Sequence, residues 1–152
     1  LCDRRQRQMC IRDRETGEGA GFGGNEYTSE AAQRLLNEAA RYLGTPYVWG
    51  GYSPSGFDCS GFVSYCLTNS GVRNTGRLTA QGLYNICTPV SQSEAQPGDL
   101  IFFTGTYDAG EPVTHIGIYV GNGQMIHCGH PVQYTSINSP YWQSHFYGFG
   151  RW

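Results

Sequence analysis

The chain has 152 residues, of which 39% are hydrophobic, and its formal net charge is −2. This length supports a single hydrophobic core, and the weak acidic charge excludes the basic surface typical of a nucleic-acid-binding protein. No run approaches the roughly 18 consecutive apolar residues of a membrane-spanning helix, so we expect no membrane span. The six cysteines form no Cys-x-x-Cys pair, which argues against a zinc ribbon or a thioredoxin-like motif.

Residues 1–26 are predicted to be a disordered leader or linker. They have few periodic apolar positions, so they bury too little surface to offset the entropy of ordering them. The run from Gln6 to Arg14 also resembles translated sequencing-adapter sequence, which would make part of the leader an artefact of gene assembly. The other interpretation is the end of a linker from an upstream domain, which suits the glycines of 17–24. The predicted folded domain is therefore residues 27–152.

Helices dominate the first part of this domain. A helix is predicted over residues 28–44, because Thr28 supplies a hydroxyl N-cap and apolar residues then recur at helical spacing. A loop rich in glycine over 49–56 separates it from a second helix over 59–71, and Gly71 is expected to end that helix. A third, short helix is predicted over 79–85.

Strands and turns are predicted for all of the remaining chain. A buried strand over 100–103 follows turn residues, and an alternating strand covers 115–120. A glycine-rich turn then leads into a strand over 124–128, and a last strand covers 146–152. Helices followed by antiparallel strands indicate an α+β domain, with the N-terminal helices packed on an antiparallel sheet.

Cys59 is the first candidate for chemistry, because it lies where the glycine-rich loop meets the second helix. The free N–H groups and the positive dipole end at a helix N-terminus favour a thiolate, which is the nucleophilic form of cysteine. A lone cysteine is more often a small buried hydrophobe. A catalytic role for Cys59 therefore requires a histidine from elsewhere in the chain.

Two histidines are predicted to share one face of a hairpin. A three-residue loop closed by Val120 and Gln124 would place His127 opposite Gly117 and diagonally next to His115. The two rings would then be within hydrogen-bonding reach, with roughly 7–8 Å between the Cα atoms. A loop one residue shorter would send the rings to opposite faces.

Together these residues fit the logic of covalent catalysis, with Cys59 as nucleophile, His115 as its base and His127 as the group that orients the base. The alternative is that both histidines are ordinary strand residues with satisfied hydrogen bonds. A zinc site built from the same three residues is a further alternative, but the closely spaced ligand pair usual for catalytic zinc is absent. We therefore expect neither a metal nor an organic cofactor.

Five motifs, in order, make the chain similar to the NlpC/P60 family, and the resemblance covers about residues 30–152. The motifs are Gly-Thr-Pro-Tyr-Val-Trp-Gly-Gly at 44–51, Phe-Asp-Cys-Ser-Gly-Phe-Val at 57–63, Pro-Gly-Asp-Leu-Ile-Phe-Phe at 97–103, His-Ile-Gly-Ile-Tyr-Val-Gly at 115–121 and Met-Ile-His at 125–127. The resemblance implies a papain-like cysteine peptidase fold. It also implies hydrolysis of bacterial cell-wall stem peptides, at the bond between γ-D-glutamate and a diamino acid, meso-diaminopimelate or L-lysine.

The resemblance assigns the same three catalytic residues and adds roles around them. Tyr47 would place its hydroxyl near the thiol and assist the oxyanion. Asp58 and Ser60, which flank the cysteine, would hold the free N-terminal ammonium that some members require. Further candidates for the groove wall, with packing and capping as the alternative roles, are Trp49, Tyr52, Arg77, Thr79 and Gln81.

The predicted function is that of a peptidoglycan endopeptidase. An amidase or acyltransferase with the same Cys-His site is the second hypothesis, and a catalytically inactive wall-binding module is the third. A longer loop over 107–113 beside the site is where we expect substrate preference to lie. The resemblance implies an extracellular or wall-associated protein whose export signal lies outside this chain, and the leader is compatible with an upstream lysozyme-like domain.

Overall fold

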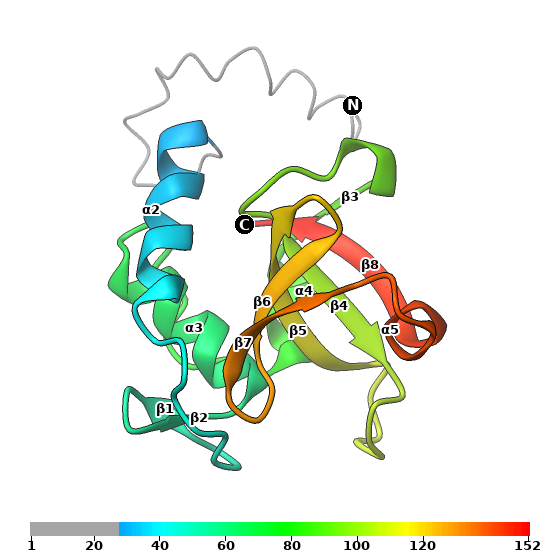
Figure 1. The fold of residues 1–152 in the computed structure, drawn as a ribbon, viewed down its shortest axis with the longest axis horizontal. Coiled ribbons are helices and arrows are strands. Elements are labelled where there is room, and N and C mark those ends of the chain that lie inside the picture. The colour runs from blue at the N-terminus through cyan, green and yellow to red at the C-terminus, as the bar shows by residue number, and fades with distance from the viewer. Residues whose placement is uncertain (1–27) are drawn as a thin grey trace.

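A curved antiparallel sheet with helices packed against it makes up the fold, which is α+β as predicted (Figure 1). The computed structural model describes residues 28–152, so the predicted disordered leader over 1–26 lies outside the described residues. A sheet of six strands has the order β3-β8-β4-β5-β6-β7, and β1 and β2 form a separate two-stranded sheet. In chain order the elements are α2 (Ser29–Ala40), β1 (Tyr52–Ser53), β2 (Gly56–Phe57), α3 (Cys59–Asn69), α4 (Ala80–Ile86), β3 (Thr88–Val90), a 3-10 turn (Gln92–Glu94), β4 (Leu100–Thr104), β5 (Val113–Gly121), β6 (Gln124–Cys128), β7 (Val132–Ser136), α5 (Pro140–His145) and β8 (Phe146–Arg151).

Helix α2 begins where its cap predicts and ends earlier than expected. The Thr28 hydroxyl accepts a hydrogen bond from the Ala31 N–H at 2.9 Å. The helix stops at Ala40 instead of continuing to Gly44. Gly44 has a φ of +89° and donates its N–H to the Val132 carbonyl, so the chain leaves the helix to join the start of β7. Between Ala40 and Gly44 each N–H donates to the carbonyl three residues back, so the last turn is tighter than an α-helix.

Helix α3 is the central helix of the fold and carries the candidate nucleophile at its first residue. The Asp58 side chain caps it by accepting from the Gly61 N–H at 2.7 Å. Eight of its eleven residues are buried, because it contacts α2 on one side and β5 and β6 on the other. It ends at Asn69, close to the predicted stop, and Gly71 follows with a φ of +81°.

The hairpin of β5 and β6 has the register that brings the two histidines to one face. Ile118 pairs with Ile126, so the next step along the strands places His127 opposite Gly117. A Cβ atom on Gly117 would lie 3.1 Å from the His127 Cβ, and the glycine therefore permits this close approach. The predicted register is confirmed.

The loop of this hairpin differs from the predicted one. Gly121 pairs with Gln124, so Val120 and Gln124 do not close a three-residue loop. The turn is the two-residue Asn122-Gly123, whose φ values of 55° and 73° are typical of a type I′ turn. A register shift between Tyr119 and Gly121 adds the extra residue as a bulge, and this bulge restores the predicted pairing farther along the strands.

A helix appears where only strands and turns were predicted. Helix α5 covers Pro140–His145, and the Ser139 hydroxyl caps it by accepting from the Trp142 N–H at 3.3 Å. A serine N-cap followed by proline at the first helical position is a recognised helix start, so the sequence did contain the signal. Strand β3 and the small β1–β2 sheet were also not predicted, and β7 lies in the part predicted as strands and turns, where it was given no bounds.

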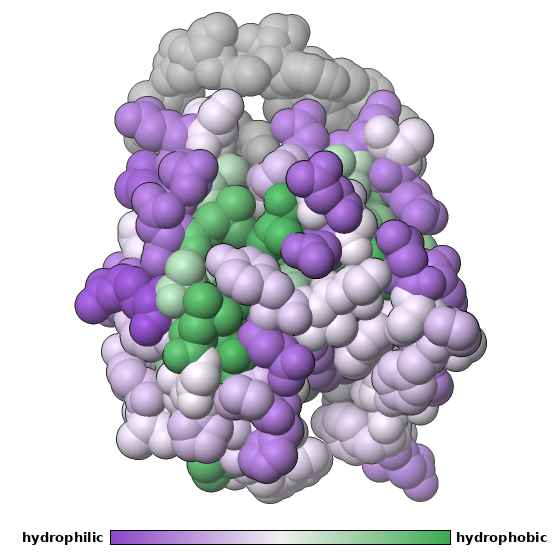
Figure 2. Space-filling view, viewed as in Figure 1, coloured by the Kyte–Doolittle hydropathy of each residue, from purple (hydrophilic) through white to green (hydrophobic). Residues whose placement is uncertain are grey.

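The apolar surface on the face shown in Figure 2 gathers between α2 and the sheet, and polar side chains cover the outer side of α2. This distribution fits an amphipathic helix that packs with one face on the core. Within residues 28–152, no helix is long and apolar enough to cross a bilayer.

Candidate active site

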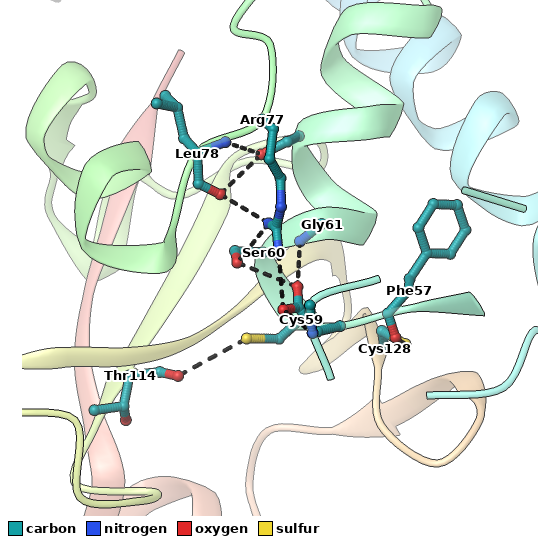
Figure 3. Close-up of polar contacts among 11 residues, drawn as sticks. Phe57, Cys59, Ser60, Gly61, Arg77, Leu78, Thr114 and Cys128 are labelled. Carbon is teal, nitrogen blue, oxygen red and sulfur yellow. Dashed lines mark hydrogen bonds and ion pairs between the residues drawn. The ribbon is translucent and has the colours of Figure 1, made fainter. Parts of the chain in front are cut away.

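The Cys59 side chain lies at the junction of α3 and β5. Its Sγ atom is directed at the Thr114 carbonyl oxygen, 3.8 Å away (Figure 3), and the residue is only 7% exposed. The backbone N–H groups of Ser60 and Ile116 also donate hydrogen bonds to the sulfur. Because Thr114 and Ile116 flank His115 on β5, the sulfur lies beside the backbone that carries the candidate base.

The two candidate histidines form a hydrogen-bonded pair on neighbouring strands. Nε2 of His115 is 2.9 Å from Nδ1 of His127, and the two rings are nearly perpendicular. His127 is buried, and its own Nε2 is 2.9 Å from the Thr135 hydroxyl on β7. The prediction that the rings share a face within hydrogen-bonding reach is confirmed. Nδ1 is the His115 ring nitrogen left for a reaction with Cys59.

Trp142 of α5 covers this pair, and sequence reasoning missed it together with α5. Its indole is stacked on the His115 ring, with 5.2 Å between centroids and 28° between planes, and it meets His127 edge-on. Phe103 packs against both Trp142 and His115. This arrangement fixes the plane of the His115 ring, and the indole face favours the imidazolium that forms when His115 accepts a proton.

Burial keeps both candidate reacting groups neutral. It raises the pKa of the Cys59 thiol to about 12, with the Asp58 charge adding to the effect, and the N–H groups of Ser60 and Ile116 and the charge of Arg77 offset only part of it. Burial also lowers the pKa of His115 to about 3, with His127 adding to this shift. The expected resting thiolate is therefore wrong. The site holds a thiol and a neutral imidazole at neutral pH, because the helix N-terminus does not compensate for the loss of solvent.

The Asp58 carboxylate is already surrounded by donors. Its Oδ1 accepts from the Gly61 N–H at 2.7 Å and from the Ser60 hydroxyl at 3.3 Å. Its Oδ2 accepts from the Gly50 N–H at 3.0 Å and from the Arg77 guanidinium at 2.8 Å. Four donors match the roughly four lone-pair sites of a carboxylate. The ammonium-binding role predicted for Asp58 and Ser60 would therefore require Arg77 to give up its ion pair.

Tyr47 lies on the loop before β1, where it bridges to Phe57. Burial raises the pKa of the Tyr47 phenol well above its ordinary value, and its proximity to Cys59 and Asp58 adds to the shift. The hydroxyl therefore stays protonated near the thiol and remains a hydrogen-bond donor. This protonation state suits the oxyanion role predicted for it.

Three of the groove-wall candidates lie at the rim of the site. Trp49 is 72% exposed and makes an edge-on contact with Tyr107, with 5.5 Å between ring centroids. The Arg77 guanidinium lies over the Tyr52 ring at 5.8 Å. The predicted longer loop over 107–113 thus reaches the loop that carries Trp49, and the two loops meet at the rim.

Thr79 and Gln81 have structural partners. The Thr79 hydroxyl accepts from the Gly82 N–H at 3.0 Å and caps α4. The Gln81 side-chain oxygen accepts a hydrogen bond from the Val113 N–H at 3.0 Å and so holds the first residue of β5. Their part in substrate binding stays a prediction.

The zinc alternative has no support from the donor geometry. Among the side chains of residues 28–152, no three from His, Cys, Asp and Glu are grouped so that they could hold a metal ion.

A cysteine at a helix N-terminus, placed beside histidines on an antiparallel sheet, defines the papain-like class of α+β folds. Residues 44–151 match the NlpC/P60 family, and the chain belongs to this family. The matched range contains the cysteine and both histidines.

Known relatives are longer proteins than this chain. It is 44% identical over 121 residues to the bifunctional muramidase/DL-endopeptidase CwlT of Bacillus subtilis, covering 78% of this chain and 36% of that protein. It is 48% identical over 118 residues to the probable endopeptidase p60 of Listeria seeligeri, covering 77% of this chain and 21% of that protein. A crystal structure of an NLP/P60-family protein similar to a lipoprotein, from Staphylococcus aureus, superposes with a TM-score of 0.77 at 40% identity, covering 87% of this chain and 44% of that one.

Acid is expected to destabilise the fold through the histidine pair, in which His127 is buried and His115 is half-buried. Burial lowers the pKa of His127 to about 4 and that of His115 to about 3, whereas histidines of the unfolded chain have a pKa near 6.5. The unfolded state therefore binds more protons, and the free energy of unfolding should fall as the pH drops from about 6.5 toward 4, by up to about 1.4 kcal/mol per pH unit for each histidine. Urea unfolding at pH 7.5, 6 and 5 measures this slope. His127→Gln should have a shallower slope, and equal slopes in the two proteins would contradict the prediction.

Proposed function

We propose that this chain is the catalytic domain of a bacterial peptidoglycan hydrolase that acts as a cysteine endopeptidase. The observation that carries the proposal is the hydrogen-bonded pair of His115 and His127 on strands next to Cys59, whose sulfur is 3.8 Å from the carbonyl oxygen of Thr114, the residue before His115, in a chain of the NlpC/P60 family. The description of CwlT as a DL-endopeptidase and that of p60 as a probable endopeptidase add support. The bond we assign joins γ-D-glutamate to the diamino acid, meso-diaminopimelate or L-lysine, of the stem peptide.

The first half of the reaction forms an acyl-enzyme. The Cys59 thiol gives its proton to Nδ1 of His115 while the sulfur attacks the carbonyl carbon of the γ-amide. Negative charge develops on the carbonyl oxygen, and we assign the Cys59 backbone N–H and the Tyr47 hydroxyl as its donors. His115 then passes the proton to the amine nitrogen of the diamino acid. The C–N bond breaks, and the γ-glutamyl group remains as a thioester.

The second half hydrolyses the thioester. Water gives a proton to Nδ1 of His115, and its oxygen adds to the thioester carbonyl. The C–S bond then breaks, and His115 returns the proton to the Cys59 sulfur. The cycle begins and ends with a thiol and a neutral imidazole, which are the states that burial favours at these two groups.

The test is digestion of L-Ala-γ-D-Glu-meso-diaminopimelate and of its L-lysine counterpart, with products identified by mass spectrometry. Release of L-Ala-D-Glu by the parent protein and not by Cys59→Ala would support the endopeptidase. If neither peptide is cleaved but iodoacetamide still alkylates Cys59, the amidase or acyltransferase hypothesis is favoured over the endopeptidase. An uncleaved peptide together with an inert Cys59 would leave the wall-binding module.

Blocking the N-terminus of the substrate is expected to change its cleavage rate by less than about threefold. The reason is that Arg77 occupies the Asp58 carboxylate that would otherwise bind a free ammonium. Paired assays of free and N-acetylated tripeptides measure the ratio. In Arg77→Met the Asp58 carboxylate loses its ion pair and becomes available to an ammonium group. The cleavage rate of the free peptide should then rise about tenfold relative to that of the acetylated one. A parent protein that cleaves only the free peptide would show that Asp58 does bind the ammonium.

We also propose that the protein acts outside the cell or at the wall, where its peptide substrate is found. The chain spans about a third of CwlT, which is described as bifunctional. A lysozyme-like domain upstream of this chain would account for the greater length of such a protein. We assign the peptidoglycan stem peptides as the binding partner of the domain described here.

A further inference from the structure

The far end of the histidine pair is hydrogen-bonded to a hydroxyl on β7. His127 makes two ring hydrogen bonds, one to His115 and one to the Thr135 hydroxyl, both at 2.9 Å. A neutral imidazole carries one N–H donor and one acceptor nitrogen. The direction of one hydrogen bond therefore determines the direction of the other.

Only one of the two proton orders prepares His115 as a base. If the Thr135 oxygen accepts from Nε2–H of His127, then Nδ1 of His127 must accept from Nε2–H of His115, and Nδ1 of His115 is left unprotonated. In the reverse order Thr135 donates, His127 donates to His115, and the proton of His115 moves to Nδ1, where the base is needed. The first order also persists when His115 becomes charged, because its Nε2–H still donates to His127.

The geometry of β7 suits an acceptor at this position. Thr135 pairs with Met125, and the neighbouring pair on the same face is two residues farther along, between His127 and Gln133. The hydroxyl thus approaches the His127 ring diagonally across the two strands. Thr135 is half-buried, so its O–H can donate outward to solvent while its oxygen accepts from the ring. The β-branched side chain has few rotamers and holds the oxygen in place.

We propose that Thr135 is a positioning residue whose hydroxyl accepts the Nε2–H of His127 and thereby leaves Nδ1 of His115 free to take the Cys59 proton. This inference rests on the proposed cysteine endopeptidase for its kinetic consequence. Its structural content concerns the free protein alone. It assigns a role in the reaction to an edge-strand threonine that touches neither the nucleophile nor the base.

The first measurement is the ring tautomer of the histidines, read from two-bond proton–nitrogen NMR correlations at pH 7.5 without substrate. We expect His127 and His115 both to carry the proton on Nε2 in the parent protein. In Thr135→Val, which keeps the shape and removes the hydroxyl, a second tautomer should become populated. Protonation of His127 on Nδ1 in the parent protein would overturn the proposal, whether or not any peptide is cleaved.

The second measurement is kinetic and uses two controls. Thr135→Val should lower kcat about 10- to 100-fold with an unchanged KM, the size of effect known for loss of the partner that fixes the second ring nitrogen of a metal-binding histidine. Thr135→Ser, which restores the hydroxyl, should recover kcat to within about threefold of the parent value. Thr88→Val, an exposed threonine on β3 at the opposite sheet edge, should match the parent protein. The rate of Cys59 alkylation by iodoacetamide, which needs no peptide substrate, should rank the variants in the same way: lower in Thr135→Val, and close to the parent rate in Thr135→Ser and Thr88→Val. A Thr135→Val protein with the parent alkylation rate and the parent tautomer would overturn the proposal.

Discussion

Replacing Cys59 with alanine is expected to lower kcat/KM for the stem peptide by about 10⁴-fold or more. The thioester intermediate cannot form without the sulfur, and loss of a nucleophile in a catalytic triad has an effect of this size. Hydrolysis of the tripeptide, followed by mass spectrometry under identical conditions, measures the change. The remaining rate would reflect only the oxyanion donors and substrate positioning.

A second cysteine on the same helix supplies the matched control. Cys66 lies on α3 and is fully buried, and burial raises the pKa of its thiol well above the ordinary value. Cys66→Ala removes a sulfur from the same helix without touching the histidine pair, so it should retain activity close to that of the parent protein. If Cys59→Ala also retained activity within about tenfold, the reaction would not proceed through this cysteine.

Replacing Asp99 with alanine is expected to reduce the free energy of unfolding by about 3–5 kcal/mol. The Asp99 carboxylate has no solvent exposure and accepts two hydrogen bonds from the Arg151 guanidinium, each at 2.7 Å, and one from the Gln96 N–H at 2.8 Å. Removing one partner of a buried ion pair leaves the other charge uncompensated, and that penalty dominates the loss. Urea unfolding followed by circular dichroism gives the difference directly.

Two further variants sharpen this test. Asp99→Asn keeps the size of the side chain and removes its charge, so it should lose less stability than the alanine variant. Asp108→Ala removes an exposed carboxylate from a loop and should change stability by less than about 0.5 kcal/mol. A loss below about 1 kcal/mol for Asp99→Ala would show that the pair contributes little beyond the cost of burying it. The pair joins the start of β4 to the end of β8, and β4 lies beside the strand that carries His115.

Much of the site was predictable because it depends on local rules. Asp58 caps a helix whose first residue is Cys59, and a polar side chain before an apolar run is a signal that acts within one turn. His115 and His127 lie close in sequence on a hairpin, so strand alternation and a register choice sufficed to bring their rings together. The bulge in the loop changed the closing pair and still preserved that register.

The groups that surround these residues were not predictable in the same way. Trp142 reaches His115 from a helix that starts 25 residues farther along the chain, and Thr135 reaches His127 from β7, an edge strand whose bounds were not predicted. Arg77 finds Asp58 through a loop with no periodic pattern. Contacts of this kind depend on which elements pack together, and periodicity in one segment carries no information about its partner.

The protonation of the site shows the same division most clearly. The sequence placed Cys59 at a helix N-terminus, and from that position alone a thiolate was expected. Whether the sulfur is solvated depends on α3, β5 and β6 closing around it, and their packing leaves it 7% exposed with a pKa of about 12. Capping and strand alternation act between residues that are close in the chain, so they can be predicted from the local sequence. Solvent exclusion is a property of the packed whole, so the charge states at Cys59 and His115 followed only from the assembled fold.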